Sequence, residues 1–427
     1  MSYGSAPKMY GLASSVDAVP MSLSSSTLNR PIPSNIKTVA ISSQSSTQSA
    51  NGFSSMQIPT GAGTGYLRPS SVYLKCRVTC TPGVGNNWSF DGPTHSASAI
   101  IRQLTISLGN QIVEQLNHYN ALHASMLLHT TSRNFIDGDS AILENSSIAR
   151  STIDNNDSVD VCIPLISGLF CGQKAIPLFL LSSPILVQVD YETVANAIRN
   201  SANADAPYTV SNVQLVYDHI MVDDSYKQAV KMALADPQNP KLYQLNVNQF
   251  LNGRLAKPTT SVTYNVGTSV SSLKGVLWTI INEPAVPDFQ SQRVFRSREF
   301  NNTCDFNVLV DGQKVNNIQI NDVATAYAEM NKVWGNLFDP VLTYGLATSV
   351  IANKLPESKT SYNTVGFLGG VSTNRFNEML SMTGVPCQSL TFTLTTQNTD
   401  AADNLYFFIP YETILTIDAN GNATLIR

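Results

Sequence analysis

The sequence is poor in charged residues. Asp, Glu, Lys and Arg make up 13% of the 427 residues, about half the share that is usual in globular domains. Serine, threonine and asparagine take their place, and a surface of short uncharged polar groups suits a protein that packs against neighbours in an assembly. The net charge of −4 and the lack of a basic tail argue against direct, sequence-specific or bulk nucleic-acid binding, since such binding rests on neutralised phosphates.

Disulfide and membrane-spanning signals are also missing. The six cysteines have neither a CxxC nor a zinc-ligand spacing, and Cys76 and Cys80 would lie roughly 13 Å apart along one strand, too far for a disulfide. No signal-peptide pattern opens the chain, and the most apolar run, 176–187, is interrupted by prolines and too short to span a bilayer. We therefore expect reduced, buried thiols and folding inside a cell. The cysteines are Cys76, Cys80, Cys162, Cys171, Cys304 and Cys387.

Catalytic motifs are not found. HExxH, GxSxG and Walker sequences do not occur, and the glycine-rich run 61–65 is followed by neither Lys-Ser nor Lys-Thr, so it predicts a loop. Three of the five histidines are five and six residues apart, a spacing that does not place metal ligands on one helix face. We expect no enzyme activity, no catalytic residues, no cofactor and no metal site. The histidines are His95, His118, His123, His129 and His219.

Arg293, Arg296 and Arg298 form the only basic cluster. A solvated loop or strand edge is the expected setting, and contact with an acidic neighbour or a phosphate is the alternative. Two acidic pairs are interpreted as cap and loop residues, because neither completes a calcium-binding pattern. These pairs are Asp154 with Asp157 and Asp223 with Asp224.

Two stretches share one order of secondary structure. Residues 104–130 and 306–334 each predict a strand, a glycine turn, a second strand and a helix. The turn glycines Gly109 and Gly312 lie 312 − 109 = 203 residues apart, close to half of the chain. We interpret this as one β-rich domain used twice. The helical stripes are Tyr119, Leu122 and Met126 in the first stretch and Val323, Tyr327, Met330 and Trp334 in the second.

Alternating apolar residues predict further short strands, which is typical of sandwiches. Residues 223–241 predict a connecting helix that Ser225 caps and that Pro237 and Pro240 end; the alternative is a helical decoration of the first sandwich. The polar stretches predict loops. The further strands are expected at 36–41, 71–81, 159–165, 185–191, 209–222, 262–266, 276–281, 390–394, 405–410 and 413–418, the loops at 42–66, 132–158, 195–207 and 335–375, and a short end at 423–427.

The predicted fold class is all-β, with two tandem eight-stranded jelly-roll sandwiches, short helices in loops and a connecting helix. The expected domains are an N-terminal arm at 1–35, a first jelly roll at 36–222, the connecting helix at 223–241 and a second jelly roll at 242–427. The arm is either extended or disordered.

Two segments of the first half resemble double jelly-roll major capsid proteins. They are IIRQLTISLGNQIVEQLNHYNALHASMLL (100–128) and VDVCIPLISGLFCGQKAIPLFLLSSPILVQVDYE (159–192). The lineage includes capsid proteins of tailless membrane-containing phages, adenoviruses, large algal viruses, virophages and polinton-like viruses. The second half resembles the lineage only in layout, and the modest loops put the elaborate outer towers of its larger members in doubt.

The resemblance implies a homotrimeric, pseudo-hexagonal capsomer that tiles an icosahedral shell. The implied partners are other copies of the chain, penton and minor capsid proteins, and an internal membrane that the arm would reach. The implied location is the virion capsid, assembled inside the host cell. The alternative is a viral spike or carbohydrate-binding β-sandwich protein, which would carry clustered surface aromatics, whereas the three tryptophans here are scattered. A cupin-type enzyme would need a metal cluster that the sequence does not offer.

Overall fold

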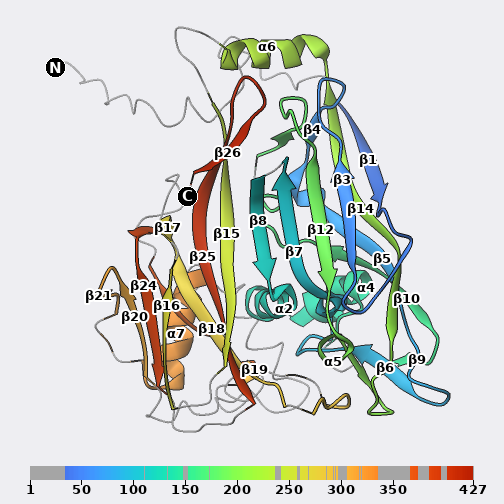
Figure 1. Ribbon diagram of the computed structural model, residues 1–427, viewed down its shortest axis with the longest axis vertical. Coiled ribbons are helices and arrows are strands. Elements are labelled where there is room, and N and C mark those ends of the chain that lie inside the picture. Colours follow the sequence, from blue (N-terminus) through green and yellow to red (C-terminus); the bar gives the residue numbers. More distant parts are fainter. Residues whose placement is uncertain are drawn as a thin grey trace.

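The computed structural model describes two groups of strands that lie side by side, one from residues 34–222 and one from residues 243–426 (Figure 1). The predicted arm lies almost wholly outside the described residues. These residues are 34–109, 111–131, 133–147, 152–172, 174–235, 242–256, 260–267, 269–284, 286–291, 293, 295–296, 305–316, 318, 320–334, 366–373, 384–395 and 402–426.

The first group is a sandwich of two main sheets. One sheet has the order β10-β5-β14-β4-β11, with β1 and β2 also paired to β14, and the other has the order β3-β12-β7-β8. A small sheet, β13-β6-β9, lies at one end (Figure 1). The strands are β1 (Ser34–Ser42), β2 (Thr47–Ser49), β3 (Phe53–Ile58), β4 (Tyr66–Leu67), β5 (Tyr73–Cys80), β6 (Asn87–Phe90), β7 (Ile101–Leu108), β8 (Gln111–Asn117), β9 (Ile153–Asp154), β10 (Ser158–Pro164), β11 (Ile176–Pro177), β12 (Ile185–Tyr191), β13 (Ile198–Asn200) and β14 (Tyr208–Val222).

The second group is a sandwich of the same design. Its larger sheet has the order β19-β18-β25-β17-β23, with β22 paired to β18 and with β15 and β26 paired to β25, and its smaller sheet has the order β16-β24-β20-β21. The strands are β15 (Tyr243–Ala256), β16 (Ser261–Val266), β17 (Val270–Leu273), β18 (Gly275–Asn282), β19 (Phe295–Arg296), β20 (Asp305–Val310), β21 (Gln313–Lys314), β22 (Gly369–Ser372), β23 (Val385–Cys387), β24 (Leu390–Thr395), β25 (Asp403–Ile417) and β26 (Ala423–Ile426).

The two sandwiches repeat one strand order. β10-β5-β14-β4-β11 corresponds to β22-β18-β25-β17-β23, and β3-β12-β7-β8 corresponds to β16-β24-β20-β21. The same bond recurs where each long strand changes neighbours: the Arg68 N–H donates to the Asp218 carbonyl at 3.0 Å, and the Lys274 N–H donates to the Pro410 carbonyl at 2.9 Å. The predicted fold class, one β-rich domain used twice, is confirmed, and short strands such as β2 and β9 add to the basic set.

The hairpin-and-helix unit predicted in each half is confirmed. It comprises β7, β8 and helix α2 (Tyr119–Thr130) in the first half, and β20, β21 and helix α7 (Val323–Trp334) in the second. The second turn has left-handed backbone at both Asp311 (φ 50°) and Gly312 (φ 79°), as a two-residue hairpin of matching twist requires. The α2 residues are buried on nearly every side, so the helix is a core element rather than one with a single apolar stripe.

Several stretches predicted as loops contain regular structure. Residues 42–66 include β3, in which Met56 and Ile58 are buried against β12. The polar stretch 132–158 forms helices α3 (Arg133–Asp137) and α4 (Asp139–Glu144) before β9, and 195–207 includes β13 and the end of helix α5 (Val194–Ala197). These elements are too short for a periodic pattern, and the packing around them stabilises them. Most of the loop predicted at 335–375 lies outside the described residues, but its end forms β22.

Two strand predictions in the second half need correction. β25 runs unbroken where two strands were expected. Pro410 lies at the point where the strand paired with β25 changes from β18 to β17, so the N–H that proline lacks interrupts no ladder of hydrogen bonds. The 14-residue strand β15 was not predicted at all, although it pairs with β25 along its whole length.

The connecting element is helix α6 (Asp224–Leu234), with Asp223 at the N-cap position. The prediction that Ser225 caps it is wrong, since Ser225 lies within the helix, and Pro237 and Pro240 lie outside the described residues. Figure 1 shows α6 across one end of the two sandwiches.

The expectation of buried thiols holds only in part. Cys76, Cys80 and Cys387 are buried, but Cys162 is half-buried and Cys171 is exposed. All five are free, and burial raises the pKa of Cys76 to about 12. Cys304 lies outside the described residues.

Candidate functional site: the junction between the two sandwiches

The two sandwiches meet where β8 of the first lies beside β15 of the second (Figure 1). Within the described residues, each of these strands pairs with a strand on one side only. Side chains of β15 bond the free edge of β8: the Asn252 amide donates to the Asn117 carbonyl at 2.7 Å, and the Gln249 amide donates to the Val113 carbonyl. The Tyr411 hydroxyl donates to Gln249 Oε1 at 2.6 Å and orients it. Edge carbonyls of β8 thereby gain partners within a buried contact.

Glu114 lies in this junction on an irregular part of β8. The β7–β8 register shifts between Ile106 and Ser107, as at a β-bulge, and the Glu114 side chain is buried. Its carboxylate accepts hydrogen bonds from the Ser167 hydroxyl and, at 2.8 Å, from the Gly168 N–H. Burial raises the pKa of Glu114 to about 7, although these donors lower it. With a pKa of about 7, the Glu114 carboxyl gains or loses its proton near neutral pH.

The backbone that donates to Glu114 packs directly on β15. A Cβ added at Gly168 would lie 1.9 Å from the Asn248 carbonyl oxygen, a distance that real atoms do not reach. Glycine is therefore required here because the backbones of the two sandwiches touch.

A buried ion-pair cluster forms a second part of the junction. Asp91, which follows β6, has its Oδ1 3.0 Å from Arg199 Nε, and its Oδ2 accepts from Arg293 Nε of the second sandwich at 2.6 Å. The Arg293 N–H also donates to Asp91 Oδ1 at 3.0 Å. Burial alone would raise the pKa of Asp91, but the two guanidinium groups outweigh it and hold that pKa below its ordinary value.

The solvated setting predicted for the arginine cluster is wrong for Arg293. Its side chain is only 15% exposed, and the alternative, contact with acidic neighbours, is confirmed. Burial lowers its pKa, but the neighbouring acids, Asp91 foremost, raise it further, so the side chain stays charged. Arg298 and the side chain of Arg296 lie outside what the structure describes.

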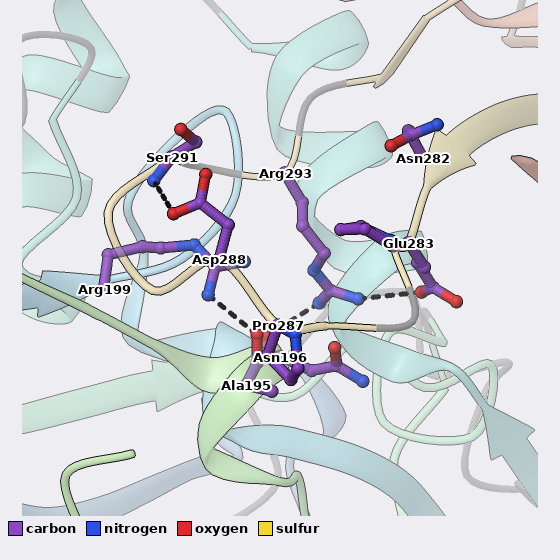
Figure 2. A pocket seen from close by; sticks show the side chains of 10 residues that line it. Ala195, Asn196, Arg199, Asn282, Glu283, Pro287, Asp288, Ser291 and Arg293 are labelled. Atoms are coloured by element: carbon purple, nitrogen blue, oxygen red, sulfur yellow. Dashed lines mark hydrogen bonds and ion pairs between the residues drawn. The ribbon is translucent and has the colours of Figure 1, made fainter. Parts of the chain in front are cut away.

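Glu283 extends this cluster along the second sandwich. Figure 2 shows the Arg293 side chain directed toward Glu283, and Arg293 NH1 donates to Glu283 Oε1 at 3.1 Å. Glu283 also accepts bonds from the Tyr406 hydroxyl and from Arg254, each at 2.5 Å. The Tyr406 ring meets the ring of His118 edge-on, with centroids 5.1 Å apart. Charges of alternating sign thus cross the junction, each with a hydrogen-bonded partner, as a buried network requires.

Contacts at both ends complete the junction. At one end the Tyr243 hydroxyl donates to the Ala175 carbonyl at 2.9 Å, and the Ser182 N–H donates to the Gly421 carbonyl at 3.1 Å. At the other end the Asn200 N–H donates to the Phe289 carbonyl at 2.8 Å. The sandwiches are therefore fixed to each other along the whole length of their contact.

A cavity of about 290 Å³ opens beside the ion-pair cluster (Figure 2). Its charged lining groups already have partners in the chain: Arg199 and Arg293 bond to Asp91, and Asp288 accepts from the Gln290 N–H at 2.9 Å. We interpret the cavity as part of the junction rather than as a ligand site. Its lining residues are Ala195, Asn196, Arg199, Asn282, Glu283, Pro284, Pro287, Asp288, Ser291 and Arg293.

The histidines occupy separate structural positions. His219 Nε2 accepts from the Gly65 N–H at 2.8 Å, His95 Nδ1 lies 3.0 Å from the Phe90 carbonyl, and His123 lies 3.4 Å from Glu144. Burial lowers the pKa of His129 to about 3. Over the described ranges, no three His, Cys, Asp or Glu side chains are grouped to hold a metal ion, so the predicted lack of a metal site stays a prediction.

The two acidic pairs lie apart from the junction. Asp154 belongs to β9 and its carbonyl accepts from the Asp157 N–H at 3.1 Å, while Asp223 and Asp224 open α6.

None of the helices that the structure describes has the length and apolar character that a bilayer-spanning helix needs.

Sequence comparison and structure comparison give different results. No family model and no curated protein matches the chain by sequence. Among solved structures, the chain is similar to PBCV-1 VP54 fitted into a reconstruction of the virophage Sputnik, with 13% identity, coverage of 94% of this chain and 98% of that chain, and a TM-score of 0.59. It is also similar to the Faustovirus major capsid protein (8% identity, 94% and 92% coverage, TM-score 0.57) and to the capsid protein in the 3.5 Å structure of Sputnik (11%, 94% and 90%, TM-score 0.56).

These similarities define the class of fold. The solved structures are double jelly-roll major capsid proteins, and the chain has that fold over most of its length. Identity this low shows the shared fold and leaves the role of the chain to be argued from its own residues.

Proposed function

We propose that this chain is a major capsid protein, three copies of which form a pseudo-hexagonal capsomer that tiles an icosahedral virus shell. The observation that carries the proposal is the pair of sandwiches with one strand order, fixed together by a continuous buried junction. Three chains with two sandwiches each supply 3 × 2 = 6 similar units, enough for a near-hexagonal ring. The capsid proteins with the same fold over nearly their whole length support this role.

The junction suits a shell component for a mechanical reason. A ring of six units holds its shape only if the two units within each chain do not hinge, and interfaces between domains are usually small and mobile. Here backbone contact at Gly168 and the ion pairs of Asp91 oppose hinging. A permanent trimer would bury on the order of 2,000 Å² or more at each interface.

The proposal includes the remaining expectations. The domains would be an N-terminal arm at 1–35, jelly rolls at 36–222 and 242–427, and a connecting helix at 223–241. Penton and minor capsid proteins would be further partners, and an internal membrane is a candidate partner of the arm. The protein would act in the virion capsid without enzyme activity, after folding inside the host cell.

Light scattering after size exclusion tests the proposal. A trimer of the 46.2 kDa chain has a mass of 3 × 46.2 = 138.6 kDa, and it should resist dilution and appear hexagonal by electron microscopy. A monodisperse monomer would overturn the proposal. Binding of that monomer to a glycan array would favour the alternative, a spike or carbohydrate-binding protein.

A further inference from the structure

We propose that the outer edge of β1 docks on β21 of a second copy of the chain. The inference rests on the proposed function and names the surface through which the copies meet. Its basis is that the contact inside one chain, β15 against β8, has an unused equivalent on the outside of the same chain.

The equivalence follows from the repeated strand order. β8 and β21 each follow the turn of the repeated hairpin and end the four-stranded sheet, and β1 and β15 each pair with the last long strand of their sandwich. In the second sandwich β15 meets β8 of the first. The equivalent contact would join β1 to β21, and these two strands lie in different sandwiches.

The register of this equivalence can be fixed by residue. β14 begins to pair with β4 at His219, and β25 begins to pair with β17 at Tyr411. His219 and Tyr411 are therefore equivalent. Their partners across the ladder are Lys37 on β1 and Gln249 on β15. Lys37 therefore occupies the place of Gln249, the residue whose side chain bonds β8 within the chain.

The two equivalent positions differ in exposure. Gln249 is buried in the junction, whereas Lys37 is exposed and none of the nine residues of β1 is buried. Ile36, an apolar side chain, is 55% exposed. Within the described residues no strand pairs with the outer edge of β1, and both residues of β21, Gln313 and Lys314, are also exposed. A long uncovered edge strand is a liability for a free protein, so coverage by a partner is expected.

The partner that fits this edge is another copy of the same chain. β21 is equivalent to β8, the strand that already meets the equivalent of β1, so the contact repeats an arrangement that the fold accommodates. A head-to-tail contact between two different surfaces closes into a ring when the rotation permits. Two sandwiches per chain and three chains would supply the six units of such a ring.

Cysteine crosslinking tests this surface in the full chain. The variant carries Lys37→Cys and Lys314→Cys in a background of Cys171→Ser and Cys304→Ser. These changes remove the thiol that is exposed among the described residues and the one that lies outside them. After mild oxidation, denaturing electrophoresis without reductant should show covalent trimers as the main product. The matched control replaces Lys37→Cys by Ser158→Cys, an exposed position on β10 at the opposite edge of the same sheet, and should remain monomeric on the gel.

The outcomes separate this inference from the proposed function. A trimer mass by light scattering with crosslinking only in the Lys37 variant supports both. A trimer mass with no crosslinking, or with equal crosslinking in the control, overturns the β1–β21 surface and leaves the capsomer proposal standing. A monomer mass overturns both.

A second variant does not depend on disulfide geometry. Ala40→Glu places a charge on an exposed residue of β1, where the free chain tolerates it. Ala40 occupies the place of Asn252, which is buried against β8, so a buried contact with a second copy would not tolerate the charge. The dissociation constant of the trimer should rise about tenfold or more, which corresponds to about 1.4 kcal/mol or more. Unchanged dissociation, with folding shown intact by circular dichroism, would contradict the inference.

Discussion

Replacing Glu114 by glutamine tests the chemistry of the junction. The carboxyl is buried on β8, and burial raises its pKa from the ordinary 4.5 to about 7. A carboxyl whose pKa is raised on folding stabilises the folded state fully below its unfolded pKa, and this contribution is lost as the pH rises through the folded pKa. The difference of 7 − 4.5 = 2.5 pH units corresponds to about 3 kcal/mol at about 1.36 kcal/mol per unit.

Glutamine resembles the protonated carboxyl in size and in having one acceptor oxygen and one donor group, but it cannot ionise. The free energy of unfolding of Glu114→Gln minus that of the wild type should therefore increase by about 3 kcal/mol between pH 4 and pH 8. Urea unfolding at a series of pH values measures it, and taking the difference between two proteins cancels groups that both contain. Gln115→Glu is the matched control, because it adds a carboxyl on the exposed side of the same strand; its difference should vary by less than about 1 kcal/mol. A Glu114→Gln difference that does not change with pH would refute the reasoning.

Three other substitutions test the junction and the core. Asp91→Asn removes the carboxylate that pairs with two buried guanidinium groups, so that Arg293 keeps only Glu283 as a counterion. It should lower the free energy of unfolding by about 3–5 kcal/mol, measured with urea at pH 7. Gly168→Ala should separate the sandwiches, detected as a second unfolding transition, or lower the free energy of unfolding by about 2 kcal/mol or more, detected as a lower urea midpoint. Gly63, which has open space around it, is the control, and Gly63→Ala should change the free energy of unfolding little. Trp278→Ala removes a fully buried ring and should cost about 3–5 kcal/mol in the same assay; a loss below 1 kcal/mol would contradict the core assignment.

The repeated hairpin-and-helix unit could be predicted because its signals are local. Apolar alternation, a turn glycine and a helical run all lie within about one hairpin of each other, so sequence neighbours determine the structure. β15 could not be predicted in this way, because Asn246, Asn252 and Gly253 disfavour a strand on propensity alone. Asn252 bonds β8, and Gly253 leaves room for the ring of Phe407. Asn252 and Gly253, which lower the strand propensity of this stretch, are therefore the residues through which β15 contacts β8 and β25.

The ion-pair cluster of Asp91 and Arg293 could not be predicted from the sequence either. The sequence displays the charge of Arg293 but gives no sign of Asp91, which lies 202 residues away along the chain. Surface charge is the usual setting of arginine, so the solvated interpretation followed, and only the fold places the two side chains 2.6 Å apart. A junction between two domains is a non-local feature, and its polar residues follow no period along the chain.

The same reasoning explains why the inner and outer surfaces of the repeat differ in sequence. β1 and β15 occupy equivalent places in the repeated strand order but carry different residues. Gln249 is a neutral side chain held by Tyr411, which suits a permanent contact formed as one chain folds. Lys37 is charged and exposed, and a lysine on an uncovered edge strand opposes unwanted strand pairing by the free chain. If β1 docks on a second copy as proposed, this edge must stay soluble while the chain is free and be covered only after the chain has folded.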